Sequence, residues 1–382
     1  MHSSNTFRRR PFTYIVFLFI AILGCYHFLF QETASKAPIL RFFHTSKPEL
    51  REIPHNLWQV FLGYSPFDGL GDTIQQWVKV NQDYSYVLVS AEGAKTFVKE
   101  HYSERPHILQ TYFEIKFPIF QSDLLRYMLL EARGGVYSDV DTTPNKPVRE
   151  WIPQDLQPYT HAIVGIEYDQ LGDPEPSHGL HDRISFCQWT LASSKGHPLM
   201  ENILEEVIKA IHALAKRHRI KVSELQPTDD EVLNTTGPAI WTRVVFESLS
   251  IAAGSEVTYR NVTGLKAPRL FGDILVLPIN GFGTGQPHSG SNRDGDDSAL
   301  IRHQFKGSWK HGWSNWATLA AHSVSASEQT VLEDHVPECS RAMSWIVDCA
   351  VAEHVNLQLA KIFPEQAAST AVLKKLRWPL EV

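Results

Sequence analysis

Short apolar segments and amphipathic segments alternate from residue 53 to residue 249, and this alternation restricts the fold more than any other feature of the chain. Apolar runs predict strands at 53–61, 84–90, 136–140, 162–167 and 184–192. Helical spacing predicts helices at 72–81, 91–101, 117–133, 198–217 and 237–249. Such an order predicts an α/β domain with a largely parallel sheet, which binds ligands beyond the carboxyl ends of its strands.

The composition is that of a globular protein and excludes several classes. Of the 382 residues, 43% are hydrophobic and 20% are charged, which is enough apolar surface for a large core. The formal net charge is -6, so the chain lacks the basic excess with which nucleic-acid binders neutralise phosphates. The four cysteines form no C-x-x-C pair, which argues against zinc knuckles and disulfide scaffolds.

Residues 11–31 contain no Asp, Glu, Lys or Arg and are mostly apolar. A helix needs about 20 apolar residues to cross a bilayer, so this segment predicts one transmembrane anchor. Three arginines precede it and Glu32 follows it, which predicts a cytosolic N-terminus and a translocated body. A cleaved signal peptide is the alternative, but its apolar core is usually shorter, and Ala34 and Ala37 form only a weak cleavage site.

We therefore expect a cytosolic tail at 1–10, the anchor at 11–31, a stem at 32–50, the main folded domain at 51–330 and a C-terminal extension at 331–382. The sequons at Asn234 and Asn261 are consistent with a lumenal body. Cys339 and Cys349 can close a short disulfide loop, which would leave Cys187 unpaired and the remaining cysteine in the membrane segment. The spacing alone does not decide this pairing.

Two aspartates follow a Gly-Gly pair in the run Gly134-Gly-Val-Tyr-Ser-Asp-Val-Asp141. Residues two apart on a strand face the same side, so Asp139 and Asp141 are predicted to present two carboxylates together. Hard oxygen ligands of this kind suit Mg²⁺ or Mn²⁺, which keep positions open for phosphate oxygens. A D-x-D triplet alone is weak evidence, because a second one, Asp294-Gly-Asp296, stands in a polar loop.

Asp123 and Arg126 lie three residues apart in the predicted helix that precedes this triplet, so they share one helix face. They can act together on one end of a ligand, or they can form an ordinary surface ion pair. For Gly134 and Gly135, the alternative is a purely local role, which is to end the helix. The residues by themselves leave both alternatives open.

These residues and their surroundings resemble the Och1-like family of fungal α-1,6-mannosyltransferases, which are nucleotide-sugar glycosyltransferases. The resemblance covers about residues 51 to 310, and its motifs are collinear. The further motifs are Ile53-Pro-His-Asn-Leu-Trp-Gln59, Gly165-Ile-Glu-Tyr-Asp169, Phe186-Cys-Gln-Trp189, Gly196-His-Pro198, Thr236-Gly-Pro-Ala-Ile-Trp-Thr242 and His303-Gln-Phe-Lys-Gly-Ser-Trp-Lys310. The resemblance implies that the main domain is an α/β catalytic domain of GT-A type, with a Rossmann-like nucleotide-sugar-binding fold.

The resemblance also implies a metal site and a donor site. The metal would be Mn²⁺ or Mg²⁺, and its ligands would be Asp139, Asp141 and His303. Asp123 and Arg126 are similar to residues that contact the ribose and the sugar or phosphates of the donor. All of these residues except His303 are also expected to act in catalysis.

Four more residues resemble donor-site residues. Tyr137 is similar in position to residues that line the donor pocket. Ser308 and Trp309 are similar to residues that border the donor phosphates. Trp58 resembles the platform on which the nucleotide base stacks, although a tryptophan in a first strand is equally typical of a core.

The implied reaction is the transfer of mannose from GDP-mannose to a mannose of an N-linked glycan, with an α-1,6 linkage and retention of configuration. The implied location is the Golgi membrane, as a single-pass type II protein with a lumenal catalytic domain and a Golgi mannosyltransferase complex as partner. An inverting route would instead need a carboxylate base beside the acceptor, for which Glu167 and Asp169 are the candidates. Loop solvation explains these two side chains equally well.

Three other functions are compatible with parts of the sequence. One is a related hexosyltransferase with a glycolipid acceptor. Another is a noncatalytic Golgi glycan-binding subunit, but the presence of Asp123, Arg126 and both D-x-D aspartates argues against it. Glycosidases also use paired carboxylates, but nothing in the sequence supplies their separation. A zinc site is not favoured for the polar loop that contains His178, His181 and Asp182.

Overall fold

The computed structural model describes residues 52–62, 70–171, 183–286 and 289–305. The expected anchor at 11–31, the stem and the C-terminal extension lie outside the described residues. So do Ser308, Trp309, the His178 loop and the cysteine pair at 339 and 349. Within the described ranges, no helix combines the length and the apolar character needed to cross a bilayer.

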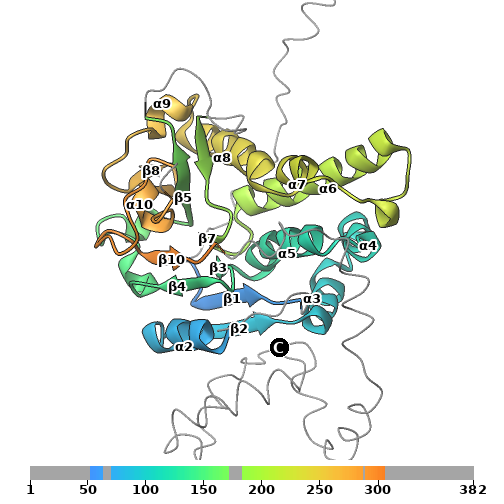
Figure 1. Ribbon diagram of the computed structural model, residues 1–382, viewed down its shortest axis with the longest axis horizontal. Helices are drawn as coiled ribbons and strands as arrows, with labels where there is room; N and C mark the ends of the chain where they lie inside the picture. Colours follow the sequence, from blue (N-terminus) through green and yellow to red (C-terminus); the bar gives the residue numbers. More distant parts are fainter. Residues whose placement is uncertain (1–51, 63–69, 172–182, 287–288, 306–382) are drawn as a thin grey trace, which may run out of the picture. The chain divides into compact units, whose positions relative to one another are not determined.

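The secondary structure alternates as expected (Figure 1). The strands are β1 (Asn56–Val60), β2 (Ser85–Val89), β3 (Gly135–Ser138), β4 (Thr142–Pro144), β5 (Ala162–Asp169), β6 (Ile184–Phe186), β7 (Thr190–Ser193), β8 (Arg269–Phe271), β9 (Ile274–Leu277) and β10 (Ile301–His303). The α-helices are α2 (Leu70–Val80), α3 (Ala91–Tyr102), α4 (Pro106–Glu114), α5 (Pro118–Arg133), α6 (Pro198–His218), α7 (Asp229–Thr235), α8 (Pro238–Ala253), α9 (Tyr259–Val262) and α10 (Ile279–Phe282). Short 3-10 helices are η1 (Val148–Glu150), η2 (Gln157–Tyr159) and η3 (Val222–Glu224).

The main sheet has the strand order β2-β1-β3-β7-β5-β9-β8, with β6 paired to β5. Strand β1 pairs in parallel with β2 and β3, and β5 pairs in parallel with β9. Strand β7 runs antiparallel between β3 and β5, and β8 runs antiparallel to β9. The α/β prediction is confirmed, and the sheet is mixed, with its parallel pairs at β2-β1-β3 and β5-β9.

Residues on both faces of the sheet are buried in two separate hydrophobic clusters. Successive residues of β3, Val136 and Tyr137, belong to different clusters, and so do Leu57 and Trp58 of β1. Because neighbouring strand residues face opposite sides, the two clusters lie on opposite faces. Helices α5, α6 and α8 contribute to the larger cluster, and Trp77 of α2 to the smaller one.

The predicted strand at 184–192 is in fact two strands, β6 and β7, separated by residues 187–189. Two carbonyl oxygens in this break accept hydrogen bonds from helix side chains: Cys187 from the Trp241 indole at 3.0 Å and Gln188 from Arg126 at 2.8 Å. Side-chain donors therefore satisfy these two carbonyl oxygens, while the Cys187 amide still donates to the Gly165 carbonyl oxygen of β5 at 2.8 Å.

Helix α5 begins with Pro118 and ends at Gly134, as the sequence predicts. Gly134 and Gly135 have φ angles of 67° and 111°, a region that L side chains rarely adopt. A Cβ atom on Gly135 would lie 2.4 Å from the carbonyl oxygen of Asn56 in β1. The pair therefore does more than end the helix, because it lets β3 run directly beside β1.

We predict that Gly135→Ala lowers the free energy of unfolding by about 2–4 kcal/mol, because the new methyl group meets backbone and the φ angle is unfavourable. Gly71→Ala is the matched control, since its Cβ meets nothing within 4 Å. That control should change stability by no more than about 1 kcal/mol. Thermal and denaturant unfolding of the purified full-length chain tests both, and equal stabilities of the two variants would contradict the packing described.

Candidate active site

The Asp139-Val140-Asp141 segment forms a turn between β3 and β4, not part of a strand. The amide and hydroxyl of Thr142 donate to the Asp139 carbonyl oxygen at 3.1 and 2.6 Å. The Gln59 side-chain amide donates to the same oxygen at 2.9 Å. The prediction that the two aspartates share a strand face is therefore wrong, because a hydrogen-bonded turn, not strand alternation, brings their carboxylates together.

His303 reaches this turn through the two-stranded sheet β4-β10. The antiparallel pairing sets His303 opposite Thr142, and the Gln304 amide donates to the Asp141 carbonyl oxygen at 2.9 Å. As a result, His303 Nε2 lies 3.2 Å from Asp141 Oδ1, although the residues are 162 positions apart in the sequence. The Trp189 indole stacks on the imidazole with ring centroids 4.6 Å apart, which fixes the plane of the ring.

Asp139, Asp141 and His303 each offer one ligand atom, and these atoms all lie within 4.8 Å of one another. No other group of this kind occurs in the part of the chain that the structure describes. Two carboxylates and one imidazole suit Mn²⁺ and are compatible with Mg²⁺. The side chains are partly exposed, so an ion and a phosphate can reach them. The donor set therefore fits the predicted metal.

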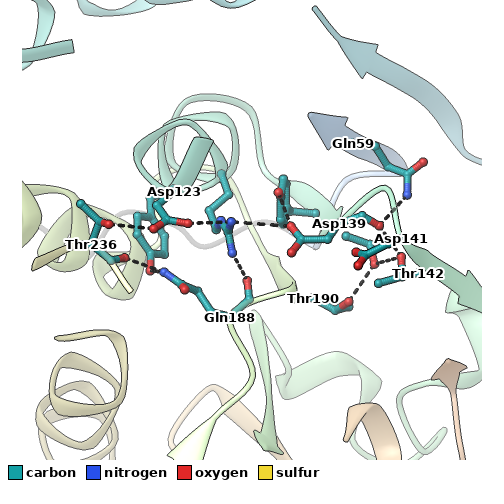
Figure 2. Close-up of polar contacts among 12 residues, drawn as sticks. Gln59, Asp123, Asp139, Asp141, Thr142, Gln188, Thr190 and Thr236 are labelled. Atoms are coloured by element: carbon teal, nitrogen blue, oxygen red, sulfur yellow. Dashed lines mark hydrogen bonds and ion pairs between the residues drawn. The ribbon is translucent and has the colours of Figure 1, made fainter. Parts of the chain in front are cut away.

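Asp123 and Arg126 lie in a stretch of α5, residues 123–130, that is buried on all sides, and they are 3% and 5% exposed. One terminal nitrogen of Arg126 lies 2.8 Å from Asp123 Oδ1 and 3.6 Å from Asp139 Oδ1. The guanidinium thus joins the helix carboxylate to the first aspartate of the turn, and Figure 2 shows Asp123 and Asp139 in one line of polar contacts. The surface ion-pair alternative is wrong, because this pair is buried.

Burial shifts the protonation of these groups. It raises the pKa of Asp123 to about 6, while Arg126 and the Thr236 hydroxyl act in the opposite direction. Burial also raises the pKa of Asp139, against the effect of Arg126. Burial alone would lower the pKa of Arg126, but neighbouring Asp139 helps to raise it above its ordinary value. Arg126 therefore stays charged, while Asp123 titrates in the mildly acidic range.

Two predicted donor-site residues lie in the core instead. Trp58 is 1% exposed, and its indole N–H donates to the Gly134 carbonyl oxygen at 2.9 Å. Neither face of this indole is open to a nucleotide base, so Trp58 is a core residue in this structure and not a stacking platform. Tyr137 is also buried, and its hydroxyl donates to Asp139 Oδ1. Tyr137 therefore orients the Asp139 carboxylate from within the protein.

Asp169 holds a loop together. Its Oδ1 accepts from the Thr263 hydroxyl at 2.7 Å, and its Oδ2 accepts from the Gly264 amide at 2.6 Å. These bonds tie the end of β5 to the segment after α9, which is a structural role and not that of a base. Glu167 is partly exposed and accepts from the Ser185 hydroxyl at 3.2 Å.

Two residues at the site were not expected from sequence. The Thr236 hydroxyl donates to Asp123 Oδ2 at 2.7 Å, and the Gln188 carbonyl oxygen accepts from Arg126 at 2.8 Å. Both stand in motifs that carry the family resemblance, but no role followed from their type. A buried hydroxyl or a main-chain carbonyl has no periodic signal, so only the motif positions could have pointed to them.

A family model described as "Glycosyltransferase sugar-binding region containing DXD motif" matches residues 68–157. The initiation-specific α-1,6-mannosyltransferase of Schizosaccharomyces pombe is 33% identical over 267 residues, which are 69% of this chain and 65% of that protein. The protein of the same name from Candida albicans is 30% identical over 283 residues, which are 69% of this chain and 73% of that protein.

A shorter match joins the chain to a mannosyl phosphorylinositol ceramide synthase of Saccharomyces cerevisiae. It is 34% identical over 106 residues, which are 26% of this chain and 25% of that protein. The chain is therefore a glycosyltransferase and belongs to the DXD-containing family of the initiation-specific α-1,6-mannosyltransferases. The resemblance stated from the motifs is confirmed.

We predict that Asp141→Asn weakens Mn²⁺ binding on the order of 100-fold, because a charged oxygen ligand becomes a neutral one. The matched control is Asp296→Asn in the second D-x-D triplet, whose carboxylate accepts from the Ser298 amide and belongs to no metal-ligating group in the described ranges. Titration calorimetry on the full-length chain measures both affinities. Equal affinities of the two variants would refute the metal assignment.

The raised pKa of Asp123 predicts a pH dependence of stability. Between pH 3.8, the ordinary pKa of an aspartate, and about pH 6, the Asp123 carboxyl group is mostly protonated in the folded protein and mostly ionised in the unfolded chain. The contribution of Asp123 therefore makes stability fall as pH rises through that window, by about 3 kcal/mol in total. Asp123→Asn cannot titrate and should lose this decline. Denaturant unfolding of both proteins from pH 4 to pH 7 measures it, and parallel curves would contradict the prediction.

Proposed function

We propose that this enzyme transfers mannose from GDP-mannose to a mannose hydroxyl of an N-linked glycan, forming an α-1,6 linkage with retention of configuration. The observation that carries the proposal is the polar network from Asp123 through Arg126 to the group of Asp139, Asp141 and His303. One bound ligand could therefore contact a metal ion held by the last group, the buried cation of Arg126 and the carboxylate of Asp123. The names of two relatives support the transferred sugar and the linkage.

Asp139, Asp141 and His303 would hold Mn²⁺ or Mg²⁺, which when bound supplies positive charge against the departing diphosphate. Arg126 adds a second positive charge beside Asp139. The Nε atom of Arg126 is buried and has no hydrogen-bond partner among the described residues. This N–H is therefore suited to a phosphate or sugar oxygen, and its buried surroundings strengthen such a contact.

Asp123 supplies the acceptor for hydroxyl groups. Each of its oxygens already has one protein partner, but a carboxylate oxygen can accept a second hydrogen bond. A ribose or mannose hydroxyl bound there is fixed relative to the phosphates, which lowers the entropic cost of reaching the transition state. This acceptor role needs the ionised form, so it weakens as the pH falls below the Asp123 pKa of about 6.

The proposal includes a location. We infer a single-pass type II protein of the Golgi membrane, with the catalytic domain in the lumen and a Golgi mannosyltransferase complex as partner. The charge-free residues 11–31 and the three arginines before them support this orientation. The acceptor supports it as well, because N-linked glycans of secretory proteins face the lumen.

A glycolipid acceptor is the second candidate. The match to the ceramide synthase favours it, but that match covers 26% of the chain, against 69% for each α-1,6-mannosyltransferase. A noncatalytic subunit is disfavoured, because every member of the carboxylate, arginine and histidine group is in contact with another member. A binding module would have no need of this buried charge network.

The test incubates the purified full-length chain with Mn²⁺, a high-mannose glycan and a panel of nucleotide sugars. We expect GDP release and one added hexose with GDP-mannose, and a loss of at least about 10³-fold in Asp139→Ala, Asp141→Ala because the diphosphate loses its counter-charge. The matched control, Asp294→Ala, Asp296→Ala, should retain activity. Linkage analysis of the product checks the α-1,6 bond.

Two results would count against the proposal. Transfer to an inositol phosphoceramide but to no glycan would favour the glycolipid candidate. A folded sample that releases nucleotide from no donor, with any of these acceptors, would contradict the transferase assignment itself.

A further inference from the structure

Two segments that are distant in sequence meet at the Asp123–Arg126 pair. One is the break at 187–189 between β6 and β7, and the other is the short connection from α7 to α8 that contains Thr236. Figure 2 shows Thr236 on the opposite side of Asp123 from Asp139. Neither segment supplies a metal ligand, so their contacts with the pair call for a separate explanation.

Thr236 controls the orientation of the Asp123 carboxylate. Its side chain is fully buried, and its hydroxyl donates to Oδ2 while Arg126 contacts Oδ1. A carboxylate with a different partner on each oxygen cannot turn about its terminal bond without losing one of them. The hydroxyl therefore fixes which lone pairs of Asp123 remain for a ligand.

Gln188 controls Arg126 in the same way. Its carbonyl oxygen accepts from Arg126 at 2.8 Å, and its side-chain amide donates to the Tyr127 hydroxyl and to the Thr236 carbonyl oxygen, each at 2.6 Å. Tyr127 in turn stacks on Trp241 with centroids 5.6 Å apart. One residue thus joins both segments to each other and to the α5 pair.

We propose that Thr236 and Gln188 are positioning residues for the nucleotide sugar, acting through Asp123 and Arg126. The inference rests on the proposed function, since it assumes that this pair binds the donor. All four residues are buried: Thr236 and Gln188 are 0% and 7% exposed, and Asp123 and Arg126 are 3% and 5% exposed, so the two supports hold the pair from within the protein.

The test must separate the hydroxyl from a possible glycan, because Thr236 also completes the sequon that starts at Asn234. Asn234 is exposed on α7, so Asn234→Gln removes the sequon and leaves the Thr236 hydroxyl in place. All variants are therefore compared in the Asn234→Gln full-length chain. Thr111→Val is the matched control, because Thr111 is equally buried on α4 and its hydroxyl donates to the His107 carbonyl oxygen.

We expect Thr236→Val to lower kcat/KM for the donor by about 10- to 100-fold, the usual effect of losing one hydrogen bond to a charged group. Thr236→Ser, which keeps the hydroxyl, should recover activity to within about threefold. Gln188→Met keeps the main-chain carbonyl oxygen that accepts from Arg126 but removes both side-chain amide bonds that hold this segment, so it should lower kcat/KM in the same direction. Thr111→Val should lower the melting temperature but leave the donor KM and kcat unchanged. A merely structural role would make Thr236→Val behave as Thr111→Val does, and that result would overturn the inference.

Binding of GDP with Mn²⁺, measured by equilibrium dialysis, separates this inference from the proposed function. If the parent chain binds GDP but transfers no mannose, the proposed function fails. The positioning inference then stands if Thr236→Val weakens GDP binding and Thr111→Val does not. It falls if Thr236→Val and Thr111→Val bind GDP equally well. A folded parent chain that neither binds nor turns over any nucleotide would overturn both.

Discussion

The buried guanidinium of Arg126 is the group on which the rest of the site depends. It cannot lose its proton, and a buried charge is costly unless carboxylates and carbonyls surround it. Asp123, Asp139 and the Gln188 carbonyl oxygen meet this requirement. Because these partners come from α5, the turn after β3 and the break before β7, one charge holds three separate segments in register.

The backbone is arranged so that these segments meet at the end of β3. Gly134 and Gly135 let the chain return from α5 directly alongside β1, so Asp139 emerges at the carboxyl end of a parallel strand. Ligands of α/β proteins bind at such strand ends. The separate β4-β10 pair then adds His303. The site therefore forms only when the main sheet and the small sheet are both in place.

Local patterns allowed much of this to be predicted, and long-range packing explains the rest. Helix α5 and its limits followed from Pro118, an apolar period and the Gly-Gly pair, and the two D-x-D aspartates followed from their residue type. The strand-face argument for Asp139 was wrong because hydrogen bonds from Gln59 and Thr142, not strand alternation, form the turn. Trp58 was ambiguous because a buried indole and a stacking platform look alike in sequence. Thr236 lies 113 residues from Asp123, and no local pattern encodes that contact.

The most direct measurement is a crystal structure of the protein with Mn²⁺ and GDP, using the anomalous signal of manganese to locate the ion. We expect one manganese peak with Asp139, Asp141 and His303 among its ligands, and a GDP oxygen within hydrogen-bonding distance of Arg126. A manganese ion elsewhere, for example at Asp294 and Asp296, or a GDP molecule remote from Arg126, would contradict the central claim that one buried cation links the donor to the metal.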